Sequence, residues 1–268
     1  MAGFAFTEKN GIRWGCFPAW EALGVCHGFT CRVGGESDLV PGGLNMALHV
    51  GDDPEKVLRN RRKAAAAMGF DLARTATCAQ VHGTVLAKVT EAEAGRGALE
   101  LATTIPGTDG LLTDCTDLPL MLFYADCTPV LLVDTESTAI AVLHAGWRGS
   151  VGRIAQKGVQ ALHDWYGTKP EAILAGIGPS IGPCCYEVDD KVRDRAKGFE
   201  GCFAPHGEGH YLLDLWKLNR QQLVEAGVKP ENISVAEVCT CCHNDQYFSY
   251  RREKGKTGRL AAVLWRKS

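Results

Sequence analysis

The sequence lacks an apolar run long enough to cross a membrane, and it lacks an excess of charge of either sign. The longest candidate run, from Leu118 to Val133, is interrupted by Asp126 and contains Pro119 and Pro129, so we expect no membrane protein. Lysine and arginine number 29 against 31 aspartates and glutamates, which gives a formal net charge of -2. A protein without a basic excess is not expected to bind nucleic acid or an anionic membrane surface.

Targeting segments, repeats and linkers are also absent. The N-terminus has no basic segment followed by an apolar core, so we expect no signal peptide and a cytoplasmic protein. The 12 cysteines among 268 residues are too few for a disulfide scaffold and are expected to be reduced thiols. No repeat, low-complexity tract or linker rich in serine or proline interrupts the chain, which predicts one domain over residues 1–268. The sequence predicts no particular oligomeric state.

Several common motifs for cofactors and metals are missing. There is no H-E-x-x-H, no pair of C-x-x-C motifs, and no H-x-E followed by P-C-x-x-C. The glycines at Gly176, Gly178 and Gly182 do not form a dinucleotide fingerprint, because the third lies one residue too far along and Pro179 removes a backbone donor. We expect instead a tight turn that brings the backbone close to a ligand or to another strand.

Turn residues and apolar periodicity predict a set of helices and strands. Helices are predicted from Asp53-Pro54 to Gly69, after Gly149-Ser150, and from Asp214 to about Gly227. Short apolar runs predict strands at 84–89, 110–113, 120–125, 130–134, 139–144, 172–177, 233–238 and 260–265. Several runs are apolar throughout, which is typical of strands buried on both faces. Since helices and strands do not alternate regularly, we predict an α/β or α+β fold with a mixed sheet or two packed sheets.

Three residues that can bind metal stand at the ends of predicted strands. His82 precedes one strand, Cys127 lies between two, and His144 ends another. Two imidazoles and a thiolate suit zinc, and three protein ligands would leave a fourth position open for water or substrate. The spacing between the three residues is not diagnostic, and each taken alone is also typical of a hydrogen-bonded core or surface residue.

Soft metal ligands are also dense at Cys239, Cys241, Cys242 and His243. Adjacent residues on an extended segment point to opposite faces, so Cys241 and Cys242 are not expected to share one ion. We therefore predict structural thiols there rather than a second metal site. Cys184 and Cys185 are expected to be buried small apolar residues.

Two arginines stand where a solvated cation is not expected. Arg61 falls on the apolar face of the first predicted helix, and Arg148 follows a strand end. Each is interpreted either as a buried or snorkelling side chain, or as an anion-binding residue that projects into a pocket. The aromatic and cationic residues of 248–252 and 257–259 fit an exposed loop as well as a loop that stacks on a purine or holds phosphate.

Five motifs occur in an order that is specific to one family. They are QVHG, ADCTPVLL, HAGWRG, IGPSIGPCCYEV and FSYRREKGKTGR, and with the upstream residues Leu44-Asn45-Met46 they extend from about Thr30 to Trp265. In these motifs the sequence resembles the laccase-domain family, also described as multicopper polyphenol oxidases or peptidoglycan editing factors. Its better characterised members are similar to zinc-dependent purine nucleoside phosphorylases.

The resemblance implies an α/β fold of two sheets between helices, in one domain. It implies that His82, Cys127 and His144 bind zinc, that Arg61 lies at the phosphate or substrate side, and that Asn45 is nearby. One departure is Gly43, where family members often have serine, and this puts a hydroxyl contact in doubt. Asp126 and Arg148 complete the expected substrate-binding residues, and Asp126 is either an acid–base or positioning group or a structural carboxylate.

The resemblance implies phosphorolysis of purine nucleosides: adenosine, inosine, guanosine or 5′-methylthioadenosine would yield free base and ribose 1-phosphate. A metal-activated water that attacks the purine would instead give adenosine deamination. The 8 histidines include no H-x-H pair, which argues against a multicopper laccase, although His/His/Cys also binds Cu2+ and would give a weak polyphenol oxidase activity. Two further alternatives are a cysteine hydrolase of peptidoglycan precursors, with Cys127 as nucleophile and His144 as base, and a binding module with a structural metal.

Overall fold

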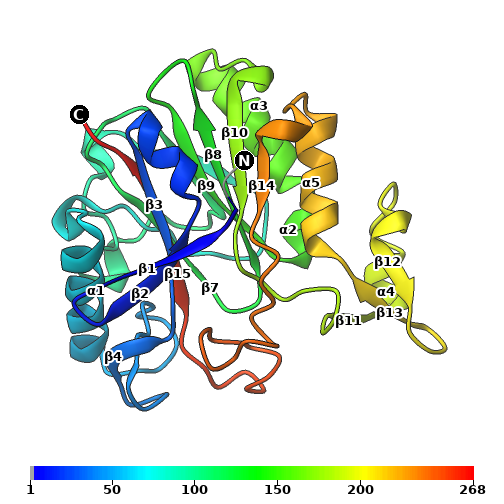
Figure 1. Ribbon diagram of the computed structural model, residues 1–268, viewed down its shortest axis with the longest axis horizontal. Coiled ribbons are helices and arrows are strands. Elements are labelled where there is room, and N and C mark those ends of the chain that lie inside the picture. The colour runs from blue at the N-terminus through cyan, green and yellow to red at the C-terminus, as the bar shows by residue number, and fades with distance from the viewer. Residues whose placement is uncertain (1–2) are drawn as a thin grey trace.

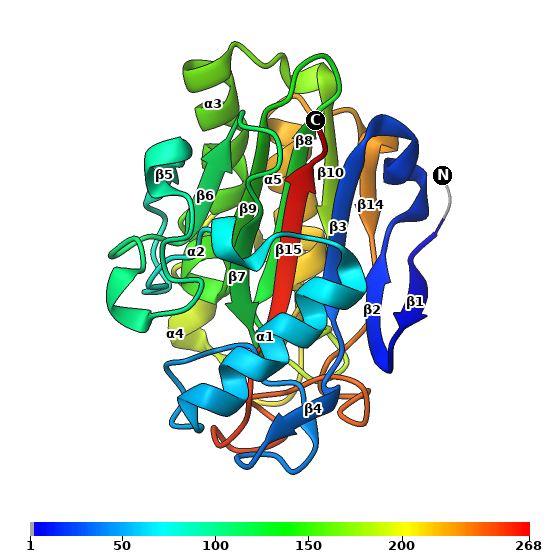
Figure 2. The same cartoon turned by 90° about the vertical axis from the view of Figure 1, so that its left-hand side faces the viewer.

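The computed structural model describes residues 3–268, in which two large β-sheets pack face to face (Figure 1, Figure 2). The first sheet is antiparallel, and its strands, in spatial order, are β1 (Ala5–Lys9), β2 (Ile12–Cys16), β3 (Val25–Thr30), β15 (Leu260–Arg266) and β7 (Leu120–Tyr124). The second is mixed, and its order is β14 (Ile233–Val235), β10 (Ile173–Ile177), β8 (Thr128–Asp134), β9 (Ile140–Ala145), β6 (Gly110–Thr113) and β5 (Leu86–Lys88). Its two outermost pairs are parallel.

Helices cover the outer faces of both sheets (Figure 1, Figure 2). Helix α1 (Pro54–Met68) packs on the first sheet, and α3 (Ile154–Tyr166) and α5 (Leu215–Glu225) pack on the second. The Asp53 carboxylate caps α1 by accepting the backbone N–H of Glu55, and Gly69 ends the helix in the left-handed conformation. The fold is therefore a four-layer α/β arrangement, which confirms the expected fold class.

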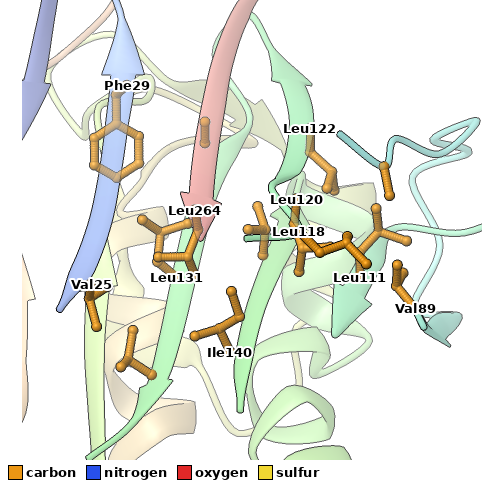
Figure 3. Packing of buried hydrophobic residues seen from close by; sticks show 14 of the residues in the cluster. Val25, Phe29, Val89, Leu111, Leu118, Leu120, Leu122, Leu131, Ile140 and Leu264 are labelled. Carbon is orange, nitrogen blue, oxygen red and sulfur yellow. The ribbon is translucent and has the colours of Figure 1, made fainter. Parts of the chain in front are cut away.

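The core between the sheets follows from the alternation of side chains along each strand (Figure 3). On β7, Leu120 and Leu122 enter the central core, while Met121 and Phe123 face the layer of α1. Every residue of β7, β8 and β9 is buried, as the unbroken apolar runs predict. Each fully buried leucine or valine stabilises the fold by about 1.5–3 kcal/mol. This core fixes the strand ends on which the site stands.

The structure also contains elements that the sequence did not predict. A third, small sheet consists of β11 (Glu187–Asp189), β13 (His210–Leu213) and β12 (Phe203–Pro205), with the short helix α4 (Asp190–Arg193) beside it. β4 (Val33–Ser37) packs against α1. The helix expected after Gly149-Ser150 is divided, because Arg153 adopts a left-handed conformation between α2 (Trp147–Val151) and α3.

The glycines of 176–182 allow the backbone to pass close to aromatic rings of other elements, in line with the close backbone approach that the sequence predicts. A Cβ atom on Gly178 would lie 2.2 Å from the Phe29 ring, and one on Gly182 would lie 2.7 Å from the Trp216 ring. Of the helices described, none has the length and hydropathy that a membrane span requires.

Candidate metal centre and cavity

The three residues at the strand ends come together, although 45 and 17 positions separate them in the sequence. His144 lies near the end of β9, Cys127 in the turn between β7 and β8, and His82 in the segment before β5. Their ligand atoms all lie within 4.8 Å of one another, and the two imidazole rings are 4.8 Å apart at their centroids. The group found within residues 3–268 has three protein donors, which leaves a tetrahedral ion one position for another ligand.

Asp109 holds both histidines in place. One carboxylate oxygen lies 2.8 Å from Nδ1 of His144 and accepts the backbone N–H of His82 at 2.8 Å. The other oxygen accepts the backbone N–H of Gly83 at 2.6 Å. When Nδ1 of His144 carries a proton and donates it to the Asp109 carboxylate, Nε2 has a free lone pair with which to bind a metal. Burial opposes the charge of Asp109, but the His144 ring and the backbone donors hold its pKa below the ordinary value.

Backbone conformation adds to this positioning. His82 has φ of 61°, a left-handed conformation that is uncommon for residues other than glycine and that turns its side chain toward Cys127 and His144. Gly146 passes close to the group, since a Cβ atom there would lie 3.0 Å from Cys127 Sγ and 3.2 Å from Cδ2 of His82. A side chain at position 146 would therefore press on two of the three candidate ligands.

The electrostatics of the group favour a metal-binding thiolate. Burial raises the pKa of the Cys127 thiol, but the positive charge of His144 and hydrogen bonds from both imidazoles lower it below its ordinary value. Burial lowers the pKa of His144, while Cys127 and Asp109 raise it above its ordinary value. A thiolate, two imidazoles and a carboxylate that orients one of them form a donor set that fits zinc.

A cavity of about 520 Å³ opens beside this group. It is lined by the three candidate ligands and by Asp126, Phe123 and Gln80, among others. Three further lining residues are arginines, and each lies over an aromatic ring of the same cavity: Arg148 over Trp147 (4.6 Å from the guanidinium carbon to the ring centroid), Arg251 over Tyr186 (5.2 Å) and Arg259 over Tyr250 (5.8 Å). The cavity thus has cations and aromatic rings in its wall together with the His/Cys/His group, and its volume lies in the range of small-molecule sites.

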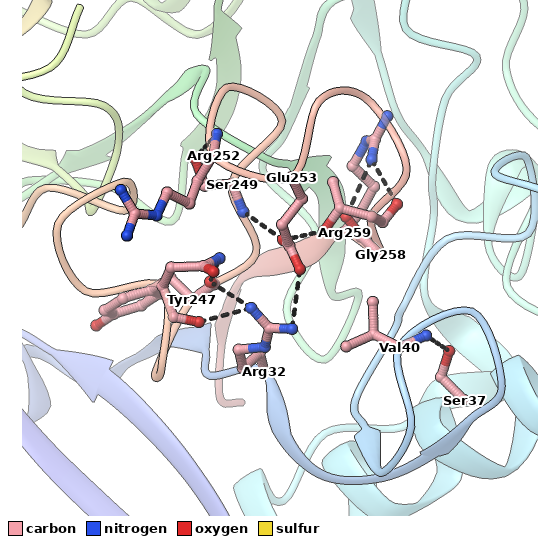
Figure 4. Close-up of polar contacts among 11 residues, drawn as sticks. Arg32, Ser37, Val40, Tyr247, Ser249, Arg252, Glu253, Gly258 and Arg259 are labelled. Atoms are coloured by element: carbon pink, nitrogen blue, oxygen red, sulfur yellow. Dashed lines mark hydrogen bonds and ion pairs between the residues drawn. The ribbon is translucent and has the colours of Figure 1, made fainter.

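The C-terminal loop that supplies Tyr250, Arg251 and Arg259 is held from two sides. On one side, Arg32, which lies between β3 and β4, donates to the Asn244 and Tyr247 carbonyls and forms an ion pair with Glu253 at 3.0 Å (Figure 4). From the cavity side, the loop is fastened to a single carboxylate, that of Asp126. It accepts hydrogen bonds from the Thr240 hydroxyl (2.6 Å), the Ser249 hydroxyl (3.1 Å) and the Arg251 backbone N–H (2.6 Å). The segment 248–259 is therefore tied to the protein on both sides, and three of its residues, Tyr250, Arg251 and Arg259, line the cavity.

Arg61 and Asn45, which the sequence predicts on the substrate side, are both buried and are not among the residues that line the cavity. Arg61 is 1% exposed and donates hydrogen bonds to the carbonyls of Met46, Gly97 and Ala98. Its guanidinium carbon lies 4.8 Å from the centroid of the Phe123 ring. These carbonyls would otherwise be buried without partners, which explains why the helix face carries an arginine. Arg148, by contrast, is exposed in the cavity wall.

The Asn45 side chain is fully buried and hydrogen-bonded within the protein. Its amide donates to the Ala47 carbonyl and the Asp52 carboxylate, and its oxygen accepts the backbone N–H of Ala47 and Arg259. Through the last of these bonds, Asn45 positions the backbone of a residue that lines the cavity.

Several residues in and around the cavity were not singled out from the sequence. Asp109 directly precedes a predicted strand, and a carboxylate next to a buried strand is the local signal that could have found it. His49 also lines the cavity, and burial together with Arg259, Arg61, His144 and His82 lowers its pKa to about 4. Tyr186 and Tyr250 lie within the family motifs, but only the fold shows that both face the same cavity.

The packed sheets and this cavity define an α/β protein whose candidate centre is a His/Cys/His group. The chain belongs to the family described as multi-copper polyphenol oxidoreductase laccase, whose model matches residues 26–267. Purine nucleoside phosphorylase YlmD of Geobacillus stearothermophilus is 43% identical over 98% of this chain and 97% of its own length. Adenosine deaminase RL5, from an unknown prokaryotic organism, is 34% identical over 84% of this chain and 87% of its own. The crystal structure of Bacillus licheniformis hypothetical protein YfiH is similar in fold, with a TM-score of 0.92, 37% identity, and coverage of 98% of this chain and 99% of its own.

Proposed function

We propose that this protein is a zinc-dependent purine nucleoside phosphorylase. Adenosine and phosphate would yield adenine and ribose 1-phosphate, and inosine, guanosine and 5′-methylthioadenosine would be further substrates. The observation that carries the proposal is the cavity itself, in which Arg148, Arg251 and Arg259 lie with aromatic rings beside the His/Cys/His group. The relatives named as purine nucleoside phosphorylases support the same reaction class.

The residues of the cavity divide into two sets of tasks. In the reaction the bond between ribose C1′ and purine N9 breaks, a phosphate oxygen bonds to C1′, and N9 takes up a proton. Arginines bind phosphate through planar, charge-assisted hydrogen bonds, and aromatic faces stack on purines. We assign phosphate binding to the arginines and base binding to Tyr250, Trp147 and Phe123. Arg61 and Asn45 are assigned positioning roles, through Phe123 and Arg259.

His82, Cys127 and His144 are the residues that would hold zinc. When bound, zinc would supply Lewis-acid stabilisation of negative charge on an oxygen atom at the reacting centre. Asp109 keeps His144 in the tautomer and orientation that this requires. We assign phosphate rather than water as the acceptor of the ribosyl group, because three arginines line the cavity.

The test is chromatography of adenosine after incubation with the zinc-loaded protein, with and without phosphate. The expected result is adenine that forms only when phosphate is present, with ribose 1-phosphate in equal amount. A His82→Ala variant should lose this activity, while His206→Ala, which alters an exposed histidine in the turn between β12 and β13, should retain it. Untouched adenosine in all samples would contradict the proposal.

Adenosine deamination is a second candidate, because a relative is named as an adenosine deaminase and the His/Cys/His group has three protein donors. In that reaction the amino group of adenine is replaced by the oxygen of water and leaves as ammonia. Inosine that forms equally with and without phosphate would establish it. Copper-dependent oxidation of polyphenols needs a separate test, in which protein loaded with Cu2+ and protein loaded with Zn2+ are compared on a phenolic substrate. Oxidation by the Cu2+ protein alone would establish this activity.

A further inference from the structure

A second group of potential metal ligands lies outside the His/Cys/His centre. The sulfur atoms of four cysteines, all within 4.8 Å of one another, come together from two loops: Cys184, Cys185, Cys239 and Cys242. The first two stand in the turn between β10 and β11, and the other two in the turn between β14 and β15. We refer to these four residues as the tetracysteine group.

The exposure of the group does not suit simple core packing. Cys184 and Cys242 are exposed and Cys185 is half-buried, which corrects the expectation that Cys184 and Cys185 are buried apolar residues. The segment 240–246 is also a series of turns and not an extended strand, so the side chains of Cys239 and Cys242 can point to one place. Cys241 packs into a neighbouring apolar cluster, which Cys239 also enters and Cys185 borders.

The spacing of the sulfur atoms fits a mononuclear tetrahedral site. Ligands about 2.3 Å from a zinc ion at tetrahedral corners lie about 3.8 Å from one another. Cys242 Sγ lies 3.4 Å from Sγ of both Cys184 and Cys185, and the other pairs lie within 4.8 Å. Cys239 and Cys242 also form a C-x-x-C pair, the commonest ligand spacing of structural zinc sites.

Backbone donors support thiolate character in this group. Cys239 Sγ accepts the backbone N–H of Gly182 at 3.2 Å and of Cys242 at 3.5 Å. Such bonds orient a ligand and stabilise its negative charge, which is the role of outer-shell contacts in metal sites. One donor comes from each loop, so the same contacts bring the two turns together.

We propose that Cys184, Cys185, Cys239 and Cys242 bind a second, structural zinc ion, closed by four thiolates. The site would fasten two loops that both reach the cavity. Tyr186 follows Cys185 directly, the Arg251 guanidinium donates to the carbonyls of Cys185 and Glu187, and Thr240 donates to Asp126. The site stands on its own geometry and does not depend on the reaction that the cavity performs.

The first test is the zinc content of the reduced, full-length protein by elemental analysis. We expect two zinc ions per chain, and one in a Cys184→Ala/Cys242→Ala variant. The matched control is Cys202→Ala/Cys241→Ala, two cysteines that pack in the adjacent apolar cluster, which should keep two. One zinc ion in the unaltered chain that the Cys184→Ala/Cys242→Ala variant retains, or two zinc ions in that variant, would overturn the proposal. One zinc ion that the variant loses would instead place the only zinc in the tetracysteine group and count against the zinc of the His/Cys/His centre.

A second variant removes the other metal centre and leaves the tetracysteine group intact, so it remains informative if the first variant fails to fold. A His82→Ala/Cys127→Ala protein should still bind one Co2+ and show the absorption of a tetrahedral cobalt–thiolate site, because all four ligands of the proposed site remain. No such absorption would overturn the proposal. So would recovery of Cys184 or Cys185 in a disulfide with Cys242 from protein isolated under reducing conditions, or iron in place of zinc.

Discussion

Oδ1 of Asp109 lies 2.8 Å from Nδ1 of His144, and the same oxygen accepts a hydrogen bond from the backbone N–H of His82. One buried acid therefore determines both the ring orientation of one candidate ligand and the backbone position of another. The two contacts join the start of β6 and the end of β9 to the segment before β5, and so bring His82 and His144 to the same place.

Replacement of Asp109 should therefore weaken metal binding more than it weakens the fold. In Asp109→Asn one oxygen becomes an amide donor that faces backbone N–H groups, and loss of such an outer-shell partner typically lowers metal affinity by about 10–100-fold. Competition with a chromogenic chelator measures this change, and Asp114→Asn, at an exposed carboxylate that follows the same strand, is the control. Equal zinc affinity in the two variants would show that Asp109 does not position the ligands.

Gly146 offers a steric test of the same centre. In Gly146→Ala the added methyl group would meet Cys127 Sγ at 3.0 Å and His82 Cδ2 at 3.2 Å, so both ligands have to shift. We expect a loss of zinc binding of at least tenfold with only a small change in Tm, measured by chelator competition and thermal unfolding. Gly201→Ala, whose Cβ would meet only the end of Lys217 at 3.8 Å, should bind zinc normally.

The strands of the core and the three candidate ligands could be predicted because each has a local signal. The runs of β7, β8 and β9 are apolar at every position that the core requires, and His82, Cys127 and His144 stand where such runs end. The N-terminal hairpin was missed even though Asn10-Gly11, both at positive φ, joins β1 to β2 with the dipeptide typical of a tight hairpin turn.

Other parts of the site depend on contacts that no local pattern encodes. Asp109 contacts His82 and His144, which are separated from it by 27 and 35 positions in the sequence. Arg61 donates to carbonyls that lie up to 37 positions further along the chain. The helix break at Arg153 contradicts the local periodicity, which continues across it. The grouping of Cys184 with Cys242 needs two loops that the β14–β10 pairing brings together.

The proposed phosphate site predicts a kinetic defect at Arg148. Its guanidinium lies over Trp147 in the cavity wall, so Arg148→Gln removes a cation without unfolding the site. A charge-assisted hydrogen bond contributes about 1.5–3 kcal/mol, which corresponds to about 10- to 150-fold in kcat/KM for phosphate. Initial rates at varied phosphate measure the effect. Arg195 also lies over the Trp147 ring, 5.9 Å from its centroid, but does not line the cavity, so Arg195→Gln should leave kcat/KM for phosphate unchanged.

His27 predicts how stability depends on pH, independently of the metal centre. The ring is buried against Phe17 and Trp20, and its Nε2 accepts the backbone N–H of Phe17 at 2.9 Å, so this nitrogen has no room for a proton. Burial lowers the pKa of His27 to about 3. In the unfolded chain the same group titrates near its ordinary value of about 6.5, so between these values the unfolded state binds more protons.

Stability should therefore fall as the pH falls below about 6.5, and His27 alone should account for about 2 kcal/mol between pH 7 and pH 5. Urea unfolding at both pH values measures the difference in free energy. A His27→Gln variant lacks this titration, so its stability should change less over the same interval, while His206→Gln, at an exposed histidine, should follow the unaltered protein. An equal pH dependence in all three proteins would show that His27 takes up its proton in the folded state.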